Sequence, residues 1–529
     1  MSILSGAPAK LGWKTGLRMG CFVLTGAVSM AMGGCTFGPT YQKPQMMAPD
    51  AYKEATPSND WKTANPQDAM LRGKWWEIFN EPELNRLEEQ LNIDNQNIAQ
   101  SLQNFVAAGD QVAQARAMYW PTVSVGINGQ RMRQPPQGTT FKGVTQSAST
   151  INSFRLPVSV SWQPDLFGTI RNEVKEYSAA AQVSAAQLEN MRLSEQASLA
   201  EYFFELRGQD ALIDLYRETV ENYQKTLDLT RARQETGLVS DEDVAGAETN
   251  LKAAQASATS LTVMRAQYEH AIALLIGKPA GQFSLPERSF TADAPAIPLG
   301  LPTQLLERRP DIAAAERTVA QYNAILGIGR SAFFPTLSIS SGVGTQSTSW
   351  SNLYNASNTF WSVGPSVSET VFDGGQRKAQ YAQYKAQYNA NVATYRETVL
   401  NAMKEVEDSL ASVRILATEI RQQEDAISSA QRYYDLANSR YETGLDTYLN
   451  VLTAQNTLLN SRQAVITLRV NRITASVQLI QALGGGWDAS QLPTDLQIKQ
   501  GYKNSGSGNS TIGQVVAAPG QHTDPATKN

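Results

Sequence analysis

Two long stretches of the chain lack proline and repeat apolar residues every three or four positions. No proline lies between residues 164 and 279 or between residues 365 and 493, and proline breaks the interior of a helix. We therefore predict helices over residues 171–233 and 378–440, each 63 residues long and about 95 Å at 1.5 Å per residue. The stripe of the second helix, with a period typical of packed helices, consists of Tyr381, Tyr384, Tyr388, Val392, Tyr395, Val399, Met403, Val406, Leu410 and Val413.

Before each of these helices the pattern changes to strict alternation of apolar and polar residues, which is typical of β-strands. Polar loops at residues 134–149 and 346–358 separate the strands of each pair. Alternating segments of about ten residues suit a transmembrane barrel, although a soluble β-sandwich would alternate in the same way. The alternating segments are residues 123–128, 154–162, 337–343 and 361–371.

The chain contains the same unit twice. Residues 116–125 recur as residues 330–339, 214 positions later, with their aromatic pair and their proline. Residues 233–238 recur as residues 440–445, 207 positions later. Because a unit of this length is too long for a solenoid repeat, we interpret the duplication as pseudo-symmetry inside one architecture. The predicted segments are a leader (1–34), an N-terminal segment (35–80), two repeats (81–290 and 300–487) and a largely disordered tail (488–529).

Four strands cannot close a barrel, and an open sheet edge in lipid leaves backbone groups unpaired at several kcal/mol each. Several copies must therefore share one barrel. Three copies would supply about 12 strands, a size found among outer-membrane barrels. The predicted fold is a mixed one, in which a long α-helical coiled-coil barrel continues from a transmembrane antiparallel β-barrel.

The first residues are typical of an export signal. Lys10, Lys14 and Arg18 precede an uncharged apolar run over residues 19–32, which is too short to span a bilayer. The following residues, 31–35, resemble a bacterial lipobox, so Cys35 is expected to become the acylated first residue of the mature protein. In bacterial lipoproteins a residue other than Asp after this cysteine favours the outer membrane, and here it is Thr.

Composition excludes several kinds of function. The chain has only two histidines and two cysteines among 529 residues, which leaves histidine catalysis, zinc clusters and disulfide frameworks poorly supplied. Lys plus Arg number 45 against 49 Asp plus Glu, for a net charge of -4, so no basic surplus exists to bind nucleic acid. We expect no enzyme activity, no cofactor and no metal.

A few residues have predicted structural roles. Asp165 and Asp373 fall where a strand gives way to a helix, where an acid can cap the helix start. The aromatic residues Trp75, Trp76 and Phe79 are expected to anchor the N-terminal segment against the long helices.

Six motifs in order give the chain a family resemblance. They are residues 35–44, 75–84, 308–312, 333–336, 372–375 and the two Thr-Gly turns. The chain resembles the outer-membrane factor family of TolC/OprM-like channels, in its NodT-type lipoprotein branch, from Cys35 to about Trp487. The resemblance implies a homotrimer with a 12-strand barrel in the outer membrane of a Gram-negative bacterium and a 12-helix periplasmic tunnel. It also implies a passive exit duct of a tripartite multidrug efflux pump, with a periplasmic adaptor (membrane fusion protein) and an inner-membrane transporter that we expect to be proton-driven.

The Thr-Gly turns place two short segments at the tip of the helical hairpins, where glycine can adopt the left-handed conformation of a tight turn. Adaptor contact is predicted there for Arg233, Thr236, Gly237, Leu238, Thr443, Gly444 and Leu445. By resemblance, Arg440, Tyr441, Leu449, Thr453 and Asn456 match gate positions, and Asp243 occupies the first-repeat position that corresponds to Asn450. Members of the family often have an Asp and an Arg where this chain has Thr453 and Asn456. Each of these residues could also serve only the helix turn.

Three alternatives to small-molecule efflux stay open. A duct for protein secretion with an ATP-driven exporter belongs to the same family. A periplasmic coiled-coil scaffold with the same lipid anchor would explain the helices but not the duplicated strand pairs. An exported hydrolase would need a catalytic constellation that the sequence does not supply. We therefore prefer an efflux duct for drugs or other small molecules.

Overall fold

The computed structural model describes residues 38–46, 49, 51–54, 61–63, 74–135, 148–288, 293–299, 305–494 and 496–498. The predicted leader, Cys35 and the end of the predicted tail lie outside these residues. The chain divides into two compact units, described here separately. The sheet unit comprises the described residues up to 43 together with residues 108–181 and 318–392, and the helical unit comprises the remainder.

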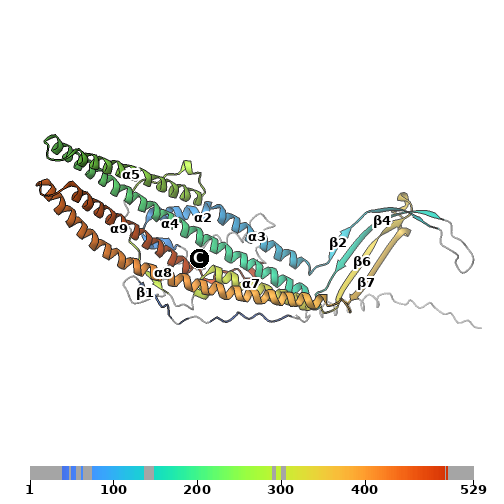
Figure 1. Ribbon diagram of the computed structural model, residues 1–529. Coiled ribbons are helices and arrows are strands. Elements are labelled where there is room, and N and C mark those ends of the chain that lie inside the picture. Colours follow the sequence, from blue (N-terminus) through green and yellow to red (C-terminus); the bar gives the residue numbers. More distant parts are fainter. Residues whose placement is uncertain are drawn as a thin grey trace, which may run out of the picture. The chain divides into compact units, whose positions relative to one another are not determined.

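The helical unit contains most of two long hairpins, shown in green and in orange to red in Figure 1; residues 169–181 and 376–392 of their long helices belong to the sheet unit. Hairpin 1 consists of α4 (Thr169–Glu235) and α5 (Asp241–Leu275), and hairpin 2 consists of α8 (Gln376–Glu442) and α9 (Tyr448–Ala482). Each helix of hairpin 2 begins and ends 207 residues after its equivalent in hairpin 1. Both predicted long helices are confirmed, and each extends by two residues at both ends.

Two shorter helices precede the strands and repeat in the same manner. They are α3 (Gln96–Ala117) and α7 (Pro310–Ser331), which have 22 residues each and begin 214 residues apart. The remaining elements are β1 (Trp61–Thr63), η2 (Trp75–Phe79), α2 (Pro82–Asp94), η3 (Ala280–Gln282), β5 (Ile297–Leu299), α6 (Leu305–Arg308), η5 (Trp350–Asn352), η6 (Ala356–Asn358) and η7 (Ala489–Gln491). None of the described helices is long and apolar enough to cross a membrane.

The sheet unit holds one antiparallel sheet with the order β2-β4-β6-β7, and β3 also pairs with β4. Its strands are β2 (Thr122–Val125), β3 (Asn128–Gln134), β4 (Ser149–Trp162), β6 (Thr336–Ser347) and β7 (Thr359–Ser368). The strand predicted near residues 123–128 is interrupted after Val125, because Pro157 on β4 has no N–H to donate. The register stays continuous from Val125–Val158 to Asn128–Arg155, so β2 and β3 act as one interrupted strand. This interrupted strand, β4, β6 and β7 are called the four arms of the sheet.

The register gives the sheet two chemically different faces. Val125, Val158, Val343 and Trp361 are cross-strand partners in one row across all four arms. The adjacent row, which points to the opposite face, contains Ser124, Ser159, Gly342 and Ser362. In the single chain Val125 is 71% exposed and Trp361 78% exposed. One face is therefore apolar and uncovered, and the other carries small polar residues.

The strand-to-helix junctions confirm the predicted acid caps. Asp165 accepts hydrogen bonds from the backbone N–H groups of Ile170 and Arg171 at the start of α4. Asp373 accepts from the N–H groups of Gly375 and Arg377 at the start of α8. The hydrogen bond from the Arg377 side chain, together with these N–H groups, lowers the pKa of Asp373. Both carboxylates thus satisfy N–H groups that have no partner within the helix.

The N-terminal aromatic residues anchor their segment as predicted. Trp75, Trp76 and Phe79 are buried, and the Phe79 ring lies 5.0 Å from the ring of Phe204 on α4. The indole N–H of Trp75 donates to Oε1 of Gln196 at 3.2 Å. These residues belong to the large apolar core of the helical unit, which also includes side chains of α2, α4, α5, α8 and α9.

Candidate functional site

The two hairpin turns have the same backbone geometry. In hairpin 1 the N–H of Gly237 donates to Gln234 O and that of Leu238 donates to Arg233 O, and Gly444 and Leu445 repeat the pattern in hairpin 2. This is a Schellman end, which requires a left-handed residue. Gly237 and Gly444 have φ values of 75° and 76°. The predicted glycine turns are therefore present at both tips.

The side chains around the turns form an exposed surface. Leu238 is 76% exposed and Leu445 is 72% exposed, and a Cβ added to either turn glycine would meet no atom within 4 Å. Thr236 and Thr443 each donate a hydroxyl hydrogen bond to a carbonyl of the preceding helical turn. The predicted adaptor-contact residues thus lie together at the tips. All of them are exposed except Arg233, which is half-buried.

The helices that follow the turns begin differently. At α5, Ser240 and Asp243 form a reciprocal capping box, in which the Asp243 carboxylate accepts from the N–H of Ser240 at 3.0 Å. At α9, Asp446 accepts from the N–H of Thr447 and from the side chain of Asn450. These two hydrogen bonds, the Asn450 bond being the stronger, lower the pKa of Asp446.

A seam of contacts joins hairpin 1 to hairpin 2 near the tips. Its apolar part is a cluster of buried side chains from all four helices, in which Tyr441 is 2% exposed and its ring lies 5.9 Å from that of Tyr448. Its polar part includes Tyr223, whose hydroxyl donates to Oδ1 of Asn456 at 3.0 Å. Burial raises the pKa of both Tyr223 and Tyr448 to about 12, so both hydroxyls stay protonated at neutral pH.

The predicted gate residues occupy two different environments. Tyr441 lies within the seam, and Asn456 contacts it through Tyr223. The other four residues lie outside the seam. Arg440 is paired with Asp446 at 3.3 Å, and Asp243 caps α5. Leu449 is 66% exposed, and Thr453 donates to the Leu449 carbonyl in its own helix. The assignment of all six as a gate stays a prediction.

Three polar members of the seam on α4 were not predicted from the sequence. They are Tyr223, Thr226 and Thr230, and Arg233 extends the same stripe. Their spacing of three, four and three residues places them on one helix face. This spacing was visible in the sequence, but polar residues at such positions are more often a solvated face than a packed seam.

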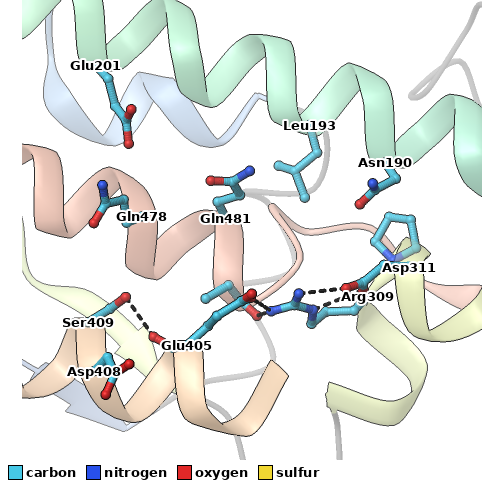
Figure 2. Close-up of a pocket in the computed structure, with 12 residues that line it drawn as sticks. Asn190, Leu193, Glu201, Arg309, Asp311, Glu405, Asp408, Ser409, Gln478 and Gln481 are labelled. Atoms are coloured by element: carbon cyan, nitrogen blue, oxygen red, sulfur yellow. Dashed lines mark hydrogen bonds and ion pairs between the residues drawn. The ribbon is translucent and has the colours of Figure 1, made fainter. Parts of the chain in front are cut away.

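A polar cavity of about 610 Å³ lies elsewhere in the helical unit. Figure 2 shows Arg309 at its edge, held between Asp311 and Glu405. Arg309 also donates to the Ala482 carbonyl at the end of α9. Glu201 is hydrogen-bonded to Gln478, and burial raises the pKa of its carboxyl. Because the charges around Arg309 are mutually paired, we interpret this group as a structural link between α7, α8 and α9.

Chemical catalysis has no candidate centre in the described part of the chain. No group of three or more His, Cys, Asp or Glu side chains there could hold a metal ion. The tip offers hydroxyls, amides, an arginine and exposed leucines, which can bind, pack and separate but do not form a nucleophile with its base.

Comparison with known proteins agrees with this geometry. The family model for outer membrane efflux protein matches residues 87–278 and 301–485, one segment in each half of the duplicated chain. An antibiotic efflux pump outer membrane protein (ArpC) and a toluene efflux pump outer membrane protein (TtgC), both from Pseudomonas putida, are each 30% identical over 459 residues. These alignments cover 86% of this chain and 93% of each relative.

The fold has solved counterparts. The structure of the outer-membrane channel OprN matches with a TM-score of 0.79 and 27% identity, over 86% of this chain and 100% of that one. The structure of CusC matches with a TM-score of 0.75 at 24% identity, which supports the fold alone. With both halves matched by the family model and relatives aligned over most of its length, the chain belongs to the outer membrane efflux protein family, whose members are channels of the outer membrane and not enzymes.

Proposed function

We propose that this protein is the passive exit duct of a tripartite efflux pump for drugs or other small molecules. The observation that carries the proposal is the similarity, over 86% of the chain, to relatives named for antibiotic and for toluene efflux. A periplasmic adaptor would dock on the duct, and an inner-membrane transporter, which we expect to be proton-driven, would supply the energy. The duct itself then needs only a wall, a pore and a closed end.

The wall would be built by three copies. Among the described strands, the outer edges of the β2/β3 arm and of β7 have no partner within the chain. Pairing these edges between copies would close a 12-strand barrel without unpaired backbone groups in lipid. The apolar row from Val125 to Trp361 supports a lipid-facing exterior, and the serine and glycine row supports a polar interior.

The periplasmic end would be the hairpin tips. The exposed leucines at equivalent positions of the two turns, Leu238 and Leu445, offer apolar contacts for the adaptor. The seam behind them, which holds Tyr441, would keep the end closed at rest. Opening would then require hairpin 2 to move away from hairpin 1.

A lipid anchor would add to membrane attachment. We propose that Cys35, which lies outside the described residues, is acylated after removal of the leader. A lipid on Cys35 leaves the strand edges unpaired, so this anchor would support the barrel and not replace it.

Planar bilayer recording tests the duct and its gate. Full-length protein should insert and conduct weakly, and Tyr441→Ala should increase the single-channel conductance several-fold. The reason is that the Tyr441 ring fills the seam, and truncating a buried aromatic side chain removes about 3 kcal/mol or more of packing. The same variant should admit more antibiotic into cells.

The matched control is Tyr433→Ala on the same helix, because Tyr433 is 44% exposed. It should conduct like the unmodified protein. Inserted protein that never conducts, in any variant, would contradict the duct. Equal conductance of Tyr441→Ala and the unmodified protein would contradict the gate assignment alone.

A further inference from the structure

The polar side of the seam is a ladder on one face of α4. Tyr223 donates to Asn456, Gln455 donates from Nε2 to Oγ1 of Thr226 at 3.3 Å, and the Thr230 and Tyr441 hydroxyls lie 3.3 Å apart. All these contacts run from hairpin 1 to hairpin 2. The ladder thus fixes the spacing of the two hairpins up to the last turn of α4.

Arg233 lies at the end of this row of contacts and makes the shortest of them. Its Nη1 donates to Tyr441 O at 2.6 Å and its Nη2 donates to Glu442 O at 2.7 Å. Its Cζ atom also lies 4.5 Å from the centre of the Tyr441 ring, within the range of a cation–π contact. One side chain of hairpin 1 therefore holds both the backbone and the ring of hairpin 2.

The acceptors suit a cation particularly well. Both carbonyls belong to the final turn of α8, where the helix dipole concentrates negative charge, and the Tyr441 carbonyl also accepts from the N–H of Gly444 in the turn. An arginine can span two carbonyls because its donors form a planar fork, whereas a lysine presents a single point charge. The contact is therefore specific for arginine in geometry as well as in charge.

The duplication provides an internal comparison. Arg440 is the equivalent of Arg233 in the second repeat, 207 residues later. Its side chain is 63% exposed and pairs with Asp446 of its own turn. The two equivalent arginines thus have different partners. Of the two, Arg233 bonds to the other hairpin and Arg440 pairs within its own turn.

We propose that Arg233 is the latch that holds the tip of the channel closed, and that its uncharged acceptors make this closure independent of pH over the physiological range. The inference rests on the proposed gate. Arg233 is a positioning residue, because it acts by fixing Tyr441 and the end of α8. The adaptor contact expected for Arg233 from the sequence stays a separate prediction.

The charged groups around the latch have partners of their own. On hairpin 1, Arg231 pairs with Glu248 at 3.7 Å, Asp241 accepts from Gln234, and Asp243 caps α5. On hairpin 2, Asp446 has a lowered pKa and pairs with Arg440. No carboxylate in the described residues accepts a hydrogen bond from Arg233. Closure by this latch consequently needs no ionised acid.

Bilayer recordings of the full-length channel test the latch. Arg233→Ala should raise the open probability about tenfold, the factor expected for loss of a charge-assisted hydrogen bond. The matched control is Arg231→Ala, two residues away on the same helix, whose partner Glu248 lies within hairpin 1. That variant should stay within twofold of the unmodified channel.

Chemical rescue separates a latch from a general structural role. Arg233→Cys should open the channel, 2-aminoethyl methanethiosulfonate should close it part of the way by restoring a lysine-like cation, and the uncharged methyl reagent should leave it open. Arg233→Lys should give an intermediate open probability. Rescue of Arg233→Cys also decides the matter if Arg233→Ala fails to assemble.

The pH dependence gives a second readout. The open probability of the unmodified channel should change less than twofold between about pH 5 and pH 9. Strong opening at pH 5 would mean that a carboxylate lock closes the tip, and would overturn the proposal. Arg233→Ala closed like the unmodified channel, with Tyr441→Ala open, would overturn the latch and leave the gate intact. A channel that never conducts would instead contradict the proposed function.

Discussion

At the scale of single residues, Glu88 is the side chain whose environment differs most from its preference. It lies on α2 and is 0% exposed, beside the fully buried Leu84 and Leu91. Neither carboxylate oxygen has a hydrogen-bond partner among the described residues. Burial therefore raises the pKa of Glu88 well above its ordinary value of 4.5.

This carboxyl predicts a pH-dependent stability. Because its pKa is higher in the folded protein, the folded state keeps a proton that the unfolded state releases above about pH 4.5. The free energy of unfolding then falls as the pH rises above that value. Glu88→Gln keeps the shape without ionising, so it should stabilise the protein by about 1 kcal/mol or more at pH 8 and by less at pH 5.

Thermal unfolding at both pH values measures this difference. The control is Glu89→Gln, since Glu89 is 57% exposed and only forms a surface pair with Lys74. Equal or lower stability of Glu88→Gln at both pH values would show that the buried carboxyl is well accommodated when ionised.

Individual residues also mark what the sequence could reveal. Asp165 and Asp373 were predictable as caps because each carboxylate and the backbone N–H groups that donate to it are near neighbours in the chain. Arg233 was not predictable, because its acceptors lie 208 and 209 residues away. An arginine before a glycine turn is equally compatible with an exposed surface or a buried contact until the second hairpin is placed beside it.

At the scale of elements, the two hairpins match in length but differ in what holds their bases. In hairpin 1, Asp210 of α4 accepts from Arg207 at 2.7 Å and from Arg265 of α5 at 2.7 Å. The same arginines donate to the carbonyls of Pro286 and Leu285 in the segment after α5. We call these side chains the linker clamp, because they bind the start of the connection between the repeats.

The clamp has no counterpart in hairpin 2, where Ala417 occupies the position equivalent to Asp210. The lengths of the helices were predictable from the missing prolines and the apolar period. The clamp was not, because charged residues at three-residue spacing usually lie on a solvated helix face. Burial of Arg207 and Asp210, at 1% and 2% exposure, is decided by the packing of α2, α4 and α5.

Removing one partner of this clamp should be costly. Asp210→Ala leaves two arginines without their shared carboxylate, and breaking a buried ion pair costs about 3–5 kcal/mol. Asp214→Ala, one turn further along α4, removes a half-exposed pair with Arg217 and should cost about 1 kcal/mol or less. Denaturant unfolding followed by helical circular dichroism compares the two, and similar losses would show that the clamp contributes no more than a surface pair.

At the scale of the whole molecule, the single chain is incomplete in its sheet rather than in its helices. The arms at the two sides of the sheet, β2/β3 and β7, each have one partner strand in the described chain. The sequence could predict that other copies must supply the missing pairing, because alternation and strand number are readable from it. It could not give the register between copies, which depends on backbone positions that no local pattern specifies.

Removing the lipid anchor while keeping the strands tests which of the two holds the copies together. We expect a chain with Cys35→Ser, exported by an ordinary cleavable leader, to reach the outer membrane as a trimer, because strand pairing satisfies the backbone in lipid whether or not the chain is acylated. Membrane fractionation, native mass spectrometry and heat-modifiable migration would measure this, with the acylated protein as the control. A monomer in the periplasm would mean that acylation precedes and drives assembly. Strand pairing alone would then not be sufficient to bring the copies together in the membrane.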